Sequence, residues 1–231
     1  MKKEFWLIAF LASLAINIIG ILINHETLQF VSKPLIILFL GIYFLIATTT
    51  KSSLKKWIFA ALFFSWGGDV LLMFVPKNEI FFLLGLASFL LAHIFYIIFF
   101  HHVRVRENVK SNPWLLVIVV VYYAALTSWL SPYLGEMKLP VRIYGIVISI
   151  MFMLAMHMLA IKNKSAGKWM MCGALLFVIS DSALAINKFY QPFEQAGVII
   201  MLTYGVAQLL IVKGAADYIN SDDKKLRLES V

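Results

Sequence analysis

The sequence contains little cysteine, little charge and none of the short motifs that mark many soluble enzymes. One cysteine among 231 residues excludes a disulfide within the chain and leaves no cysteine cluster for zinc. The GxGxxG and P-loop patterns of nucleotide-binding proteins are absent. The GxSxG pattern and a convincing Ser-His-Asp set are absent too, which disfavours a serine hydrolase. A functional site must therefore be sought among isolated polar residues.

Charged residues make up only 14% of the chain, whereas hydrophobic residues make up 62%. These proportions lie outside the range of soluble globular domains, and the apolar stretches are each near membrane-spanning length. A large soluble all-α core is therefore disfavoured. We expect a single transmembrane domain over residues 1–216, followed by a polar cytoplasmic tail over 217–231.

The apolar stretches predict an all-α fold, a bundle of eight transmembrane helices. The first stretch is longer than the core of a usual signal peptide, so it is counted as a helix. Short connections predict that neighbouring helices pack as antiparallel hairpins. The expected helices cover residues 5–23, 28–47, 57–74, 80–100, 114–130, 141–161, 169–186 and 196–212.

The net charge of +8 would suggest nucleic-acid or other anionic partners in a soluble protein. Here 15 of the 20 Lys and Arg residues lie at the N-terminus, in the second, fourth and sixth loops and in the tail. Cytoplasmic segments of membrane proteins carry such an excess, so both termini are predicted to be cytoplasmic, in a bacterial inner membrane. Membrane lipids are then expected partners, nucleic acid is not, and no obligate protein partner is evident.

Two of the expected helices contain an aspartate, Asp69 and Asp181, at membrane depth. A bare carboxylate there costs about 3 kcal/mol on insertion scales, so each is expected to face the bundle interior. The two aspartates are 112 residues apart, and a Lys-Trp pair ends 12 residues before each. This offset suggests a parallel repeat of four helices plus four, although chance similarity between apolar sequences is an alternative.

Lys33 is expected at the same level as the two aspartates, about 7–8 Å below the helix ends at 1.5 Å per residue. One interpretation is a structural ion pair between Lys33 and one aspartate, but it leaves the second aspartate without a partner. Two carboxylates in a medium of low dielectric do not both ionise easily, so one is expected to retain its proton. This arrangement suits an acid/base pair, and we take Asp69 and Asp181 as candidate catalytic residues.

Other polar residues on these helices are candidates for substrate binding. Ser65 and Ser180 are placed to hydrogen-bond to the aspartates. On the fourth helix His93 and Tyr96 lie one turn apart, and on the eighth helix Tyr204 and Gln208 do the same. Each alone is more typical of an interhelical hydrogen bond than of a ligand contact, but together they suggest a polar cavity below the carboxylates. The candidates are Lys33, Ser65, His93, Tyr96, Ser180, Tyr204 and Gln208.

Five short motifs are distributed over the second to the eighth expected helices. They are Lys33-Pro34, Ser65-x-x-Gly68-Asp69, Ala92-His93-x-x-Tyr96, Ser180-Asp181 and Tyr204-x-x-x-Gln208. In order and spacing they resemble the YhhN-like lysoplasmalogenase family. The resemblance implies an eight-helix membrane enzyme that needs no metal or organic cofactor. Its lysophospholipid substrates, the lysoplasmalogens, are hydrolysed at their vinyl ether bond to a fatty aldehyde and glycerophosphoethanolamine or glycerophosphocholine.

The two aspartates fit this chemistry, because vinyl ether hydrolysis needs an acid that protonates the alkenyl carbon and a carboxylate that stabilises the resulting cation. We expect Asp69 and Asp181 to fill these roles, in either order. A proton-coupled transporter of a small or lipid substrate is the alternative, since paired intramembrane carboxylates and a half-repeat suit it as well. A lysolipid-binding membrane protein without catalysis is a third. The Gly67-Gly68 pair has no counterpart in the seventh helix, which favours the enzyme.

Overall fold

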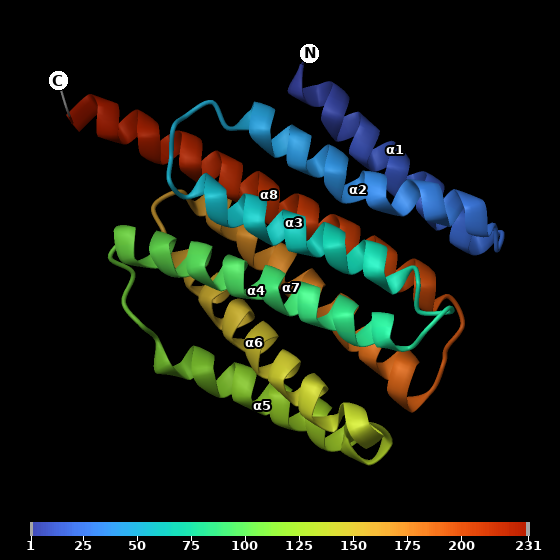
Figure 1. Cartoon of the computed structure of the whole chain (residues 1–231). Coiled ribbons are helices and arrows are strands. Elements are labelled where there is room, and N and C mark those ends of the chain that lie inside the picture. Colours follow the sequence, from blue (N-terminus) through green and yellow to red (C-terminus); the bar gives the residue numbers. More distant parts are fainter. Residues whose placement is uncertain (1, 230–231) are drawn as a thin grey trace.

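Eight long helices form the fold in a computed structural model that describes residues 2–229 (Figure 1). Residue 1 and the end of the expected tail, 230–231, lie outside the described residues. No strand occurs within residues 2–229, so the predicted all-α class is confirmed. The helices are α1 Lys3–Leu22, α2 Glu26–Ala47, α3 Lys55–Leu72, α4 Ile80–Arg106, α5 Pro113–Leu130, α6 Lys138–His157, α7 Lys164–Ala185 and α8 Ala196–Glu229.

Seven of the helices are long and apolar enough to cross a membrane. The exception is α3, whose 18 residues include the charged residues Lys55, Lys56 and Asp69. It nevertheless packs inside the bundle, against α2, α4 and α8. The chain is therefore an integral membrane protein.

Several helix ends differ from those that the sequence predicts. The last helix was expected to end at residue 212, but α8 continues to Glu229 and includes most of the expected tail. Asn220 on this extension donates a hydrogen bond of 2.9 Å to the carbonyl oxygen of Ala47. α6 begins at Lys138, so Pro140 lies inside its first turn, where a missing N–H costs nothing. α7 continues as a π-helical segment, η4 (Ile186–Tyr190).

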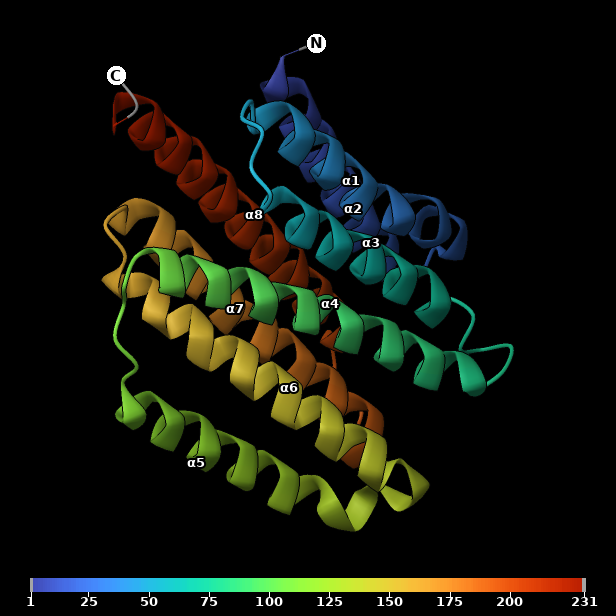
Figure 2. The same ribbon diagram turned by 60° about the vertical axis from the view of Figure 1, so that its left-hand side comes forward.

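The helices pack as sequential antiparallel hairpins, with the most extensive interfaces between α1 and α2, α3 and α4, and α7 and α8. α5 lies at one edge and packs mainly on α6 (Figure 2). The two termini lie at the same end of the bundle in both views. Across the halves, α4 packs on α6 as α8 packs on α2. α1 also packs on α8 without an equally extensive interface between α5 and α4, so the two halves correspond only in part.

The α3–α4 interface is close because a glycine faces an aromatic ring. A Cβ atom added at Gly68 would lie 2.6 Å from ring carbons of Phe89, which is closer than carbon atoms pack. Plain helix packing therefore explains this glycine, one residue before Asp69. The close approach positions the Asp69 side chain, 2% exposed as a residue, in the interior of the bundle.

Candidate active site

A cavity lies between α2, α3, α4, α6, α7 and α8, with about 780 Å³ of empty space including its opening. Most of its wall is aliphatic or aromatic. Both aspartates line it, one from α3 and the other from α7. The polar residues of the wall are Lys33, Asp69, Tyr144, Ser180, Asp181 and Tyr204.

Asp69 has a hydrogen-bond donor and a cation as neighbours. The hydroxyl of Tyr204 donates to its Oδ2 atom at 2.6 Å, which connects α8 to α3. The Nζ atom of Lys33 lies 3.9 Å from its Oδ1 atom, at the outer limit of an ion pair. The charge of Lys33 favours the ionised carboxylate, so Asp69 is suited to stabilise a positive charge in the cavity.

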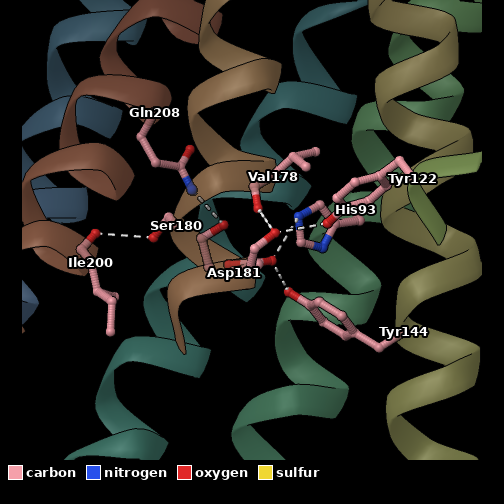
Figure 3. A network of polar contacts seen from close by, with 10 residues as sticks. His93, Tyr122, Tyr144, Val178, Ser180, Asp181, Ile200 and Gln208 are labelled. Atoms are coloured by element: carbon pink, nitrogen blue, oxygen red, sulfur yellow. Dashed lines mark hydrogen bonds and ion pairs between the residues drawn. The ribbon is translucent and has the colours of Figure 1, made fainter. Parts of the chain in front are cut away.

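Asp181 has different neighbours. The hydroxyl of Tyr144, on α6, donates to its Oδ2 atom at 2.5 Å. The Nε2 atom of His93, on α4, lies 3.8 Å from the same oxygen. Figure 3 shows the carboxylate between the phenol and the imidazole. Among the side chains that the structure describes, residues 2–222, no Lys or Arg forms an ion pair with Asp181.

The imidazole of His93 is completely buried, yet neither ring nitrogen has a hydrogen-bond partner among the described residues. Its ring packs edge-on against Tyr144 and Phe177, with centroids 5.3 Å and 4.7 Å away. A buried polar group without a partner is costly, and the polar side chain that lies near this ring is Asp181, 3.8 Å from Nε2. A water molecule or a polar atom of a ligand would satisfy the ring nitrogens.

Three candidates from the sequence form a separate, fully buried network. The hydroxyl of Tyr96 donates to Oε1 of Gln208 at 2.5 Å, and Nε2 of Gln208 donates to Oγ of Ser65 at 2.9 Å. None of the three belongs to the wall of the cavity. Gln208 lies one turn after Tyr204 on α8, so the network holds α8 against α3 and α4 directly beneath the Asp69–Tyr204 contact.

The expected hydrogen bonds from the two serines to the aspartates are wrong. The hydroxyl of Ser180 donates to the carbonyl oxygen of Ile200 at 3.0 Å, although the residue lines the cavity (Figure 3). Ser65 instead accepts from Gln208. Both serines therefore connect their helices to α8.

The sequence reasoning missed Tyr144, which contacts Asp181, and Tyr122. The Tyr122 hydroxyl lies 2.8 Å from Oγ of Ser182, the residue after Asp181. The repeat offset gave no signal for either, because the residue 112 positions after Lys33 is Gly145 and the residue 112 positions after His93 is Gly205. Asp69 on α3 nevertheless contacts residues of α2 and α8, and Asp181 on α7 contacts residues of α6 and α4.

A metal site has no support from the described residues, because no three His, Cys, Asp or Glu side chains among them come together. The arrangement instead offers two acid/base groups, two phenols and one lysine in an enclosed, mostly apolar space. Such a site can move protons to and from a substrate that has both an apolar chain and a polar centre.

Comparison with known proteins agrees with the motifs. The model of the YhhN family matches residues 28–215, which cover every helix of the cavity. The chain belongs to the YhhN family. The curated protein "Lysoplasmalogenase" of Mycobacterium tuberculosis is 31% identical over 163 residues, 69% of this chain and 60% of the relative. Human "Lysoplasmalogenase TMEM86B" is 33% identical over 135 residues, 57% of this chain and 52% of the relative.

A further YhhN relative, human "Lysoplasmalogenase TMEM86A", is 30% identical over 184 residues, which are 77% of this chain and 70% of the relative. The chain thus spans 60% of the length of the mycobacterial relatives and about half of human TMEM86B, at 52%. No solved structure matches the chain.

Proposed function

We propose that the chain hydrolyses the vinyl ether bond of lysoplasmalogens. The observation that carries this proposal is the presence of two carboxylates in one mostly apolar cavity, with a lysine beside only one of them. The likeness to curated proteins named lysoplasmalogenase supports the same reaction. The substrate class is alkenyl-glycerophosphoethanolamine or alkenyl-glycerophosphocholine, and no cofactor is required.

The first step is proton transfer from one aspartic acid to the alkenyl carbon that continues into the chain. The π electrons of the double bond form the new C–H bond, and the ether oxygen shares the resulting positive charge. The second aspartate, as a carboxylate, stabilises this oxocarbenium ion, as in two-carboxylate glycosidases. It then accepts a proton from water while the water oxygen bonds to the cationic carbon, giving a hemiacetal.

The hemiacetal decomposes through the same two groups with their roles exchanged. The aspartate that gave the first proton takes the proton of the hemiacetal hydroxyl. The other returns its proton to the glycerol oxygen as the C–O bond breaks. The sum is one water and one vinyl ether converted to one fatty aldehyde and one glycerophospho-alcohol, and both carboxyl groups return to their starting states.

The remaining candidates have supporting roles in this proposal. Lys33 binds the phosphate of the substrate or keeps Asp69 ionised. Tyr204 and Tyr144 hold the two carboxyl groups in place, and His93, with its Nε2 atom 3.8 Å from Asp181, supports the second of them from outside the cavity wall. The binding contribution of Ser65, Ser180, Tyr96 and Gln208 is indirect, because their hydrogen bonds connect the helices that bear these groups.

The charge distribution of the loops supports a location in the bacterial cytoplasmic membrane with both termini inside. The cavity then lies in the outer half of the membrane, since Asp69 is three residues from the C-terminal end of α3, the end opposite the termini. Lysolipids in the outer leaflet would reach it from the bilayer.

The proposal is tested with purified protein in detergent and lysoplasmenylethanolamine, by following aldehyde release. The wild type is expected to release aldehyde, and Asp69→Asn and Asp181→Asn each to lose about 100-fold or more in kcat, within the usual range for acid/base groups. Asp222→Asn is the matched control, because Asp222 forms an ion pair with Arg106 outside the cavity. Full turnover by Asp69→Asn would contradict the mechanism.

A proton-coupled transporter is the alternative that the two-halved packing favours. It is tested by reconstituting the same protein into vesicles and recording a pH change inside them when lysolipid is added outside. Proton flux without aldehyde release would favour transport. Binding of lysolipid without either would favour the non-catalytic alternative.

A further inference from the structure

A groove on the outside of the bundle runs between α4 and α6, with about 360 Å³ of empty space including its opening. Its wall is almost entirely apolar. The side chains of Leu83 and Ile143, 37% and 45% exposed, place it on a surface that faces lipid. It is formed by Leu83, Leu86, Ala87 and Leu90 of α4 with Ile143 and Tyr144 of α6.

The groove adjoins the cavity that contains the aspartates. Leu86 and Tyr144 line both, so these two side chains form the boundary between them. Tyr144 is also the residue that hydrogen-bonds to Asp181. The groove therefore adjoins the cavity on its Asp181 side.

Lys33 belongs to the other side of the cavity. It extends from α2, and α2 and α6 lie on opposite sides of α3 and α4 in both views of the molecule (Figures 1 and 2). The cavity thus has a cationic end near Asp69, and an apolar groove adjoins it near Asp181. A lysolipid has the same polarity, with a phosphate at one end and an aliphatic chain at the other.

We infer that the α4–α6 groove binds the unbranched alkenyl chain of the substrate, an inference that rests on the proposed function. The glycerophosphate lies toward Lys33 and the double bond lies between the aspartates. The chain then passes Leu86 and Tyr144 and leaves along α4. From Leu83 to Leu90 the groove extends about 10 Å along the helix, at 1.5 Å per residue, toward the middle of the membrane.

This orientation assigns the two aspartates. The carbon that takes the proton is the one that continues into the chain, so it lies on the side of the groove, next to Asp181. Asp181 is therefore the proton donor to carbon. Asp69, beside Lys33, is the carboxylate that stabilises the cation and accepts the proton of the attacking water.

Ala87 offers the sharpest test, because it lines the groove, is exposed, and follows Leu86 in the sequence. Ala87→Phe would fill the groove without touching the aspartates. The readout is the ratio of kcat/KM for an 18-carbon alkenyl substrate to that for a 4-carbon one, both with an ethanolamine head group. We expect the ratio to fall about tenfold or more, because only the long chain needs the groove.

Ala125→Phe is the matched control, since Ala125 is exposed on α5 and does not line the groove, and its ratio is expected to equal that of the wild type. Leu83→Trp provides a second obstruction if Ala87→Phe is unstable. Leu126→Trp probes the crevice between α5, α6 and α7, which also reaches Asp181. An unchanged ratio in both groove variants, or a fall only in Leu126→Trp, would overturn the inference. Wild-type aldehyde release tests the proposed function separately.

Discussion

Lys33 accounts for the chemical difference between the two carboxyl groups. Each of the aspartates accepts a hydrogen bond from a tyrosine, at 2.5 Å for Asp181 and 2.6 Å for Asp69. Only Asp69 has a lysine nearby, with 3.9 Å between the charged atoms. A cation beside one carboxylate and not the other is enough to separate their protonation states in a cavity with little water.

Tyr144→Phe removes the hydrogen bond to Asp181 and keeps the aromatic packing against His93. Hydrogen bonds to charged or strongly polarised groups contribute about 1.5–3 kcal/mol, so we expect kcat for aldehyde release to fall roughly 10- to 100-fold. Tyr133→Phe is the control, because Tyr133 is half-exposed at the end of the bundle. Equal activity of the two variants would remove Tyr144 from the site.

The buried network of Ser65, Tyr96 and Gln208 predicts an effect on stability. Gln208→Leu leaves the hydroxyls of Tyr96 and Ser65 buried without their partner, at a cost of about 1–3 kcal/mol each. We expect a lower midpoint of thermal unfolding in detergent, measured by circular dichroism. Tyr96→Phe added to Gln208→Leu should cost less than the sum of the two single changes, because one orphaned group is removed. Strict additivity would contradict the contact.

At the scale of secondary-structure elements, the α3–α4 contact sets the position of Asp69. Gly68→Ala places a methyl group 2.6 Å from the ring of Phe89, so the two helices must separate or the ring must move. Overpacking of this kind costs about 1–3 kcal/mol. We expect both a lower unfolding midpoint and slower aldehyde release, since the displacement reaches the adjacent carboxylate.

Gly41→Ala is the matched control for Gly68→Ala, because an added Cβ at Gly41 meets nothing within 4 Å. Helix propensity alone favours this change by up to about 1 kcal/mol. Phe89→Leu combined with Gly68→Ala should recover part of the lost stability. If Gly68→Ala behaved like Gly41→Ala, the close packing of α3 on α4 would be contradicted.

The sequence predicted the number and type of the helices because apolar stretches of membrane-spanning length have few other solutions. It also predicted that Asp69 and Asp181 face the interior, since a carboxylate is too costly against lipid. The end of α8 was wrong for a related reason. Hydropathy marks where a membrane ends, and Asn220 shows that a helix can continue past that point through contacts with other elements.

The partners of the polar side chains were less predictable. Ser180 is adjacent to Asp181 in sequence, but its hydroxyl faces α8, because successive residues of a helix point in different directions. Tyr144 could not be recognised, since one tyrosine among nine in the chain has no local signal of its own. Contacts between helices distant in sequence depend on packing that hydropathy does not encode.

At the scale of the whole molecule, the loop charges predict which end of the bundle faces the cytoplasm. In a Cys172→Ser background, Lys77→Cys in the α3–α4 loop should react with a membrane-impermeant maleimide added to intact cells. Lys110→Cys in the α4–α5 loop should react only after the cells are opened. Both residues are exposed, so access to solvent does not limit either reaction. The opposite pattern of labelling would invert the proposed orientation.

The contacts of α4 with α6 and of α8 with α2 have a consequence for how acid and base became distinct. In a symmetric dimer of two identical four-helix chains, the two carboxylates must have the same neighbours. Joining the two halves in one polypeptide lifts that constraint, because a substitution then changes one half only. Lys33 on α2 and Tyr144 on α6 are such differences, because at the 112-residue offset Lys33 corresponds to Gly145 and Tyr144 corresponds to Ser32.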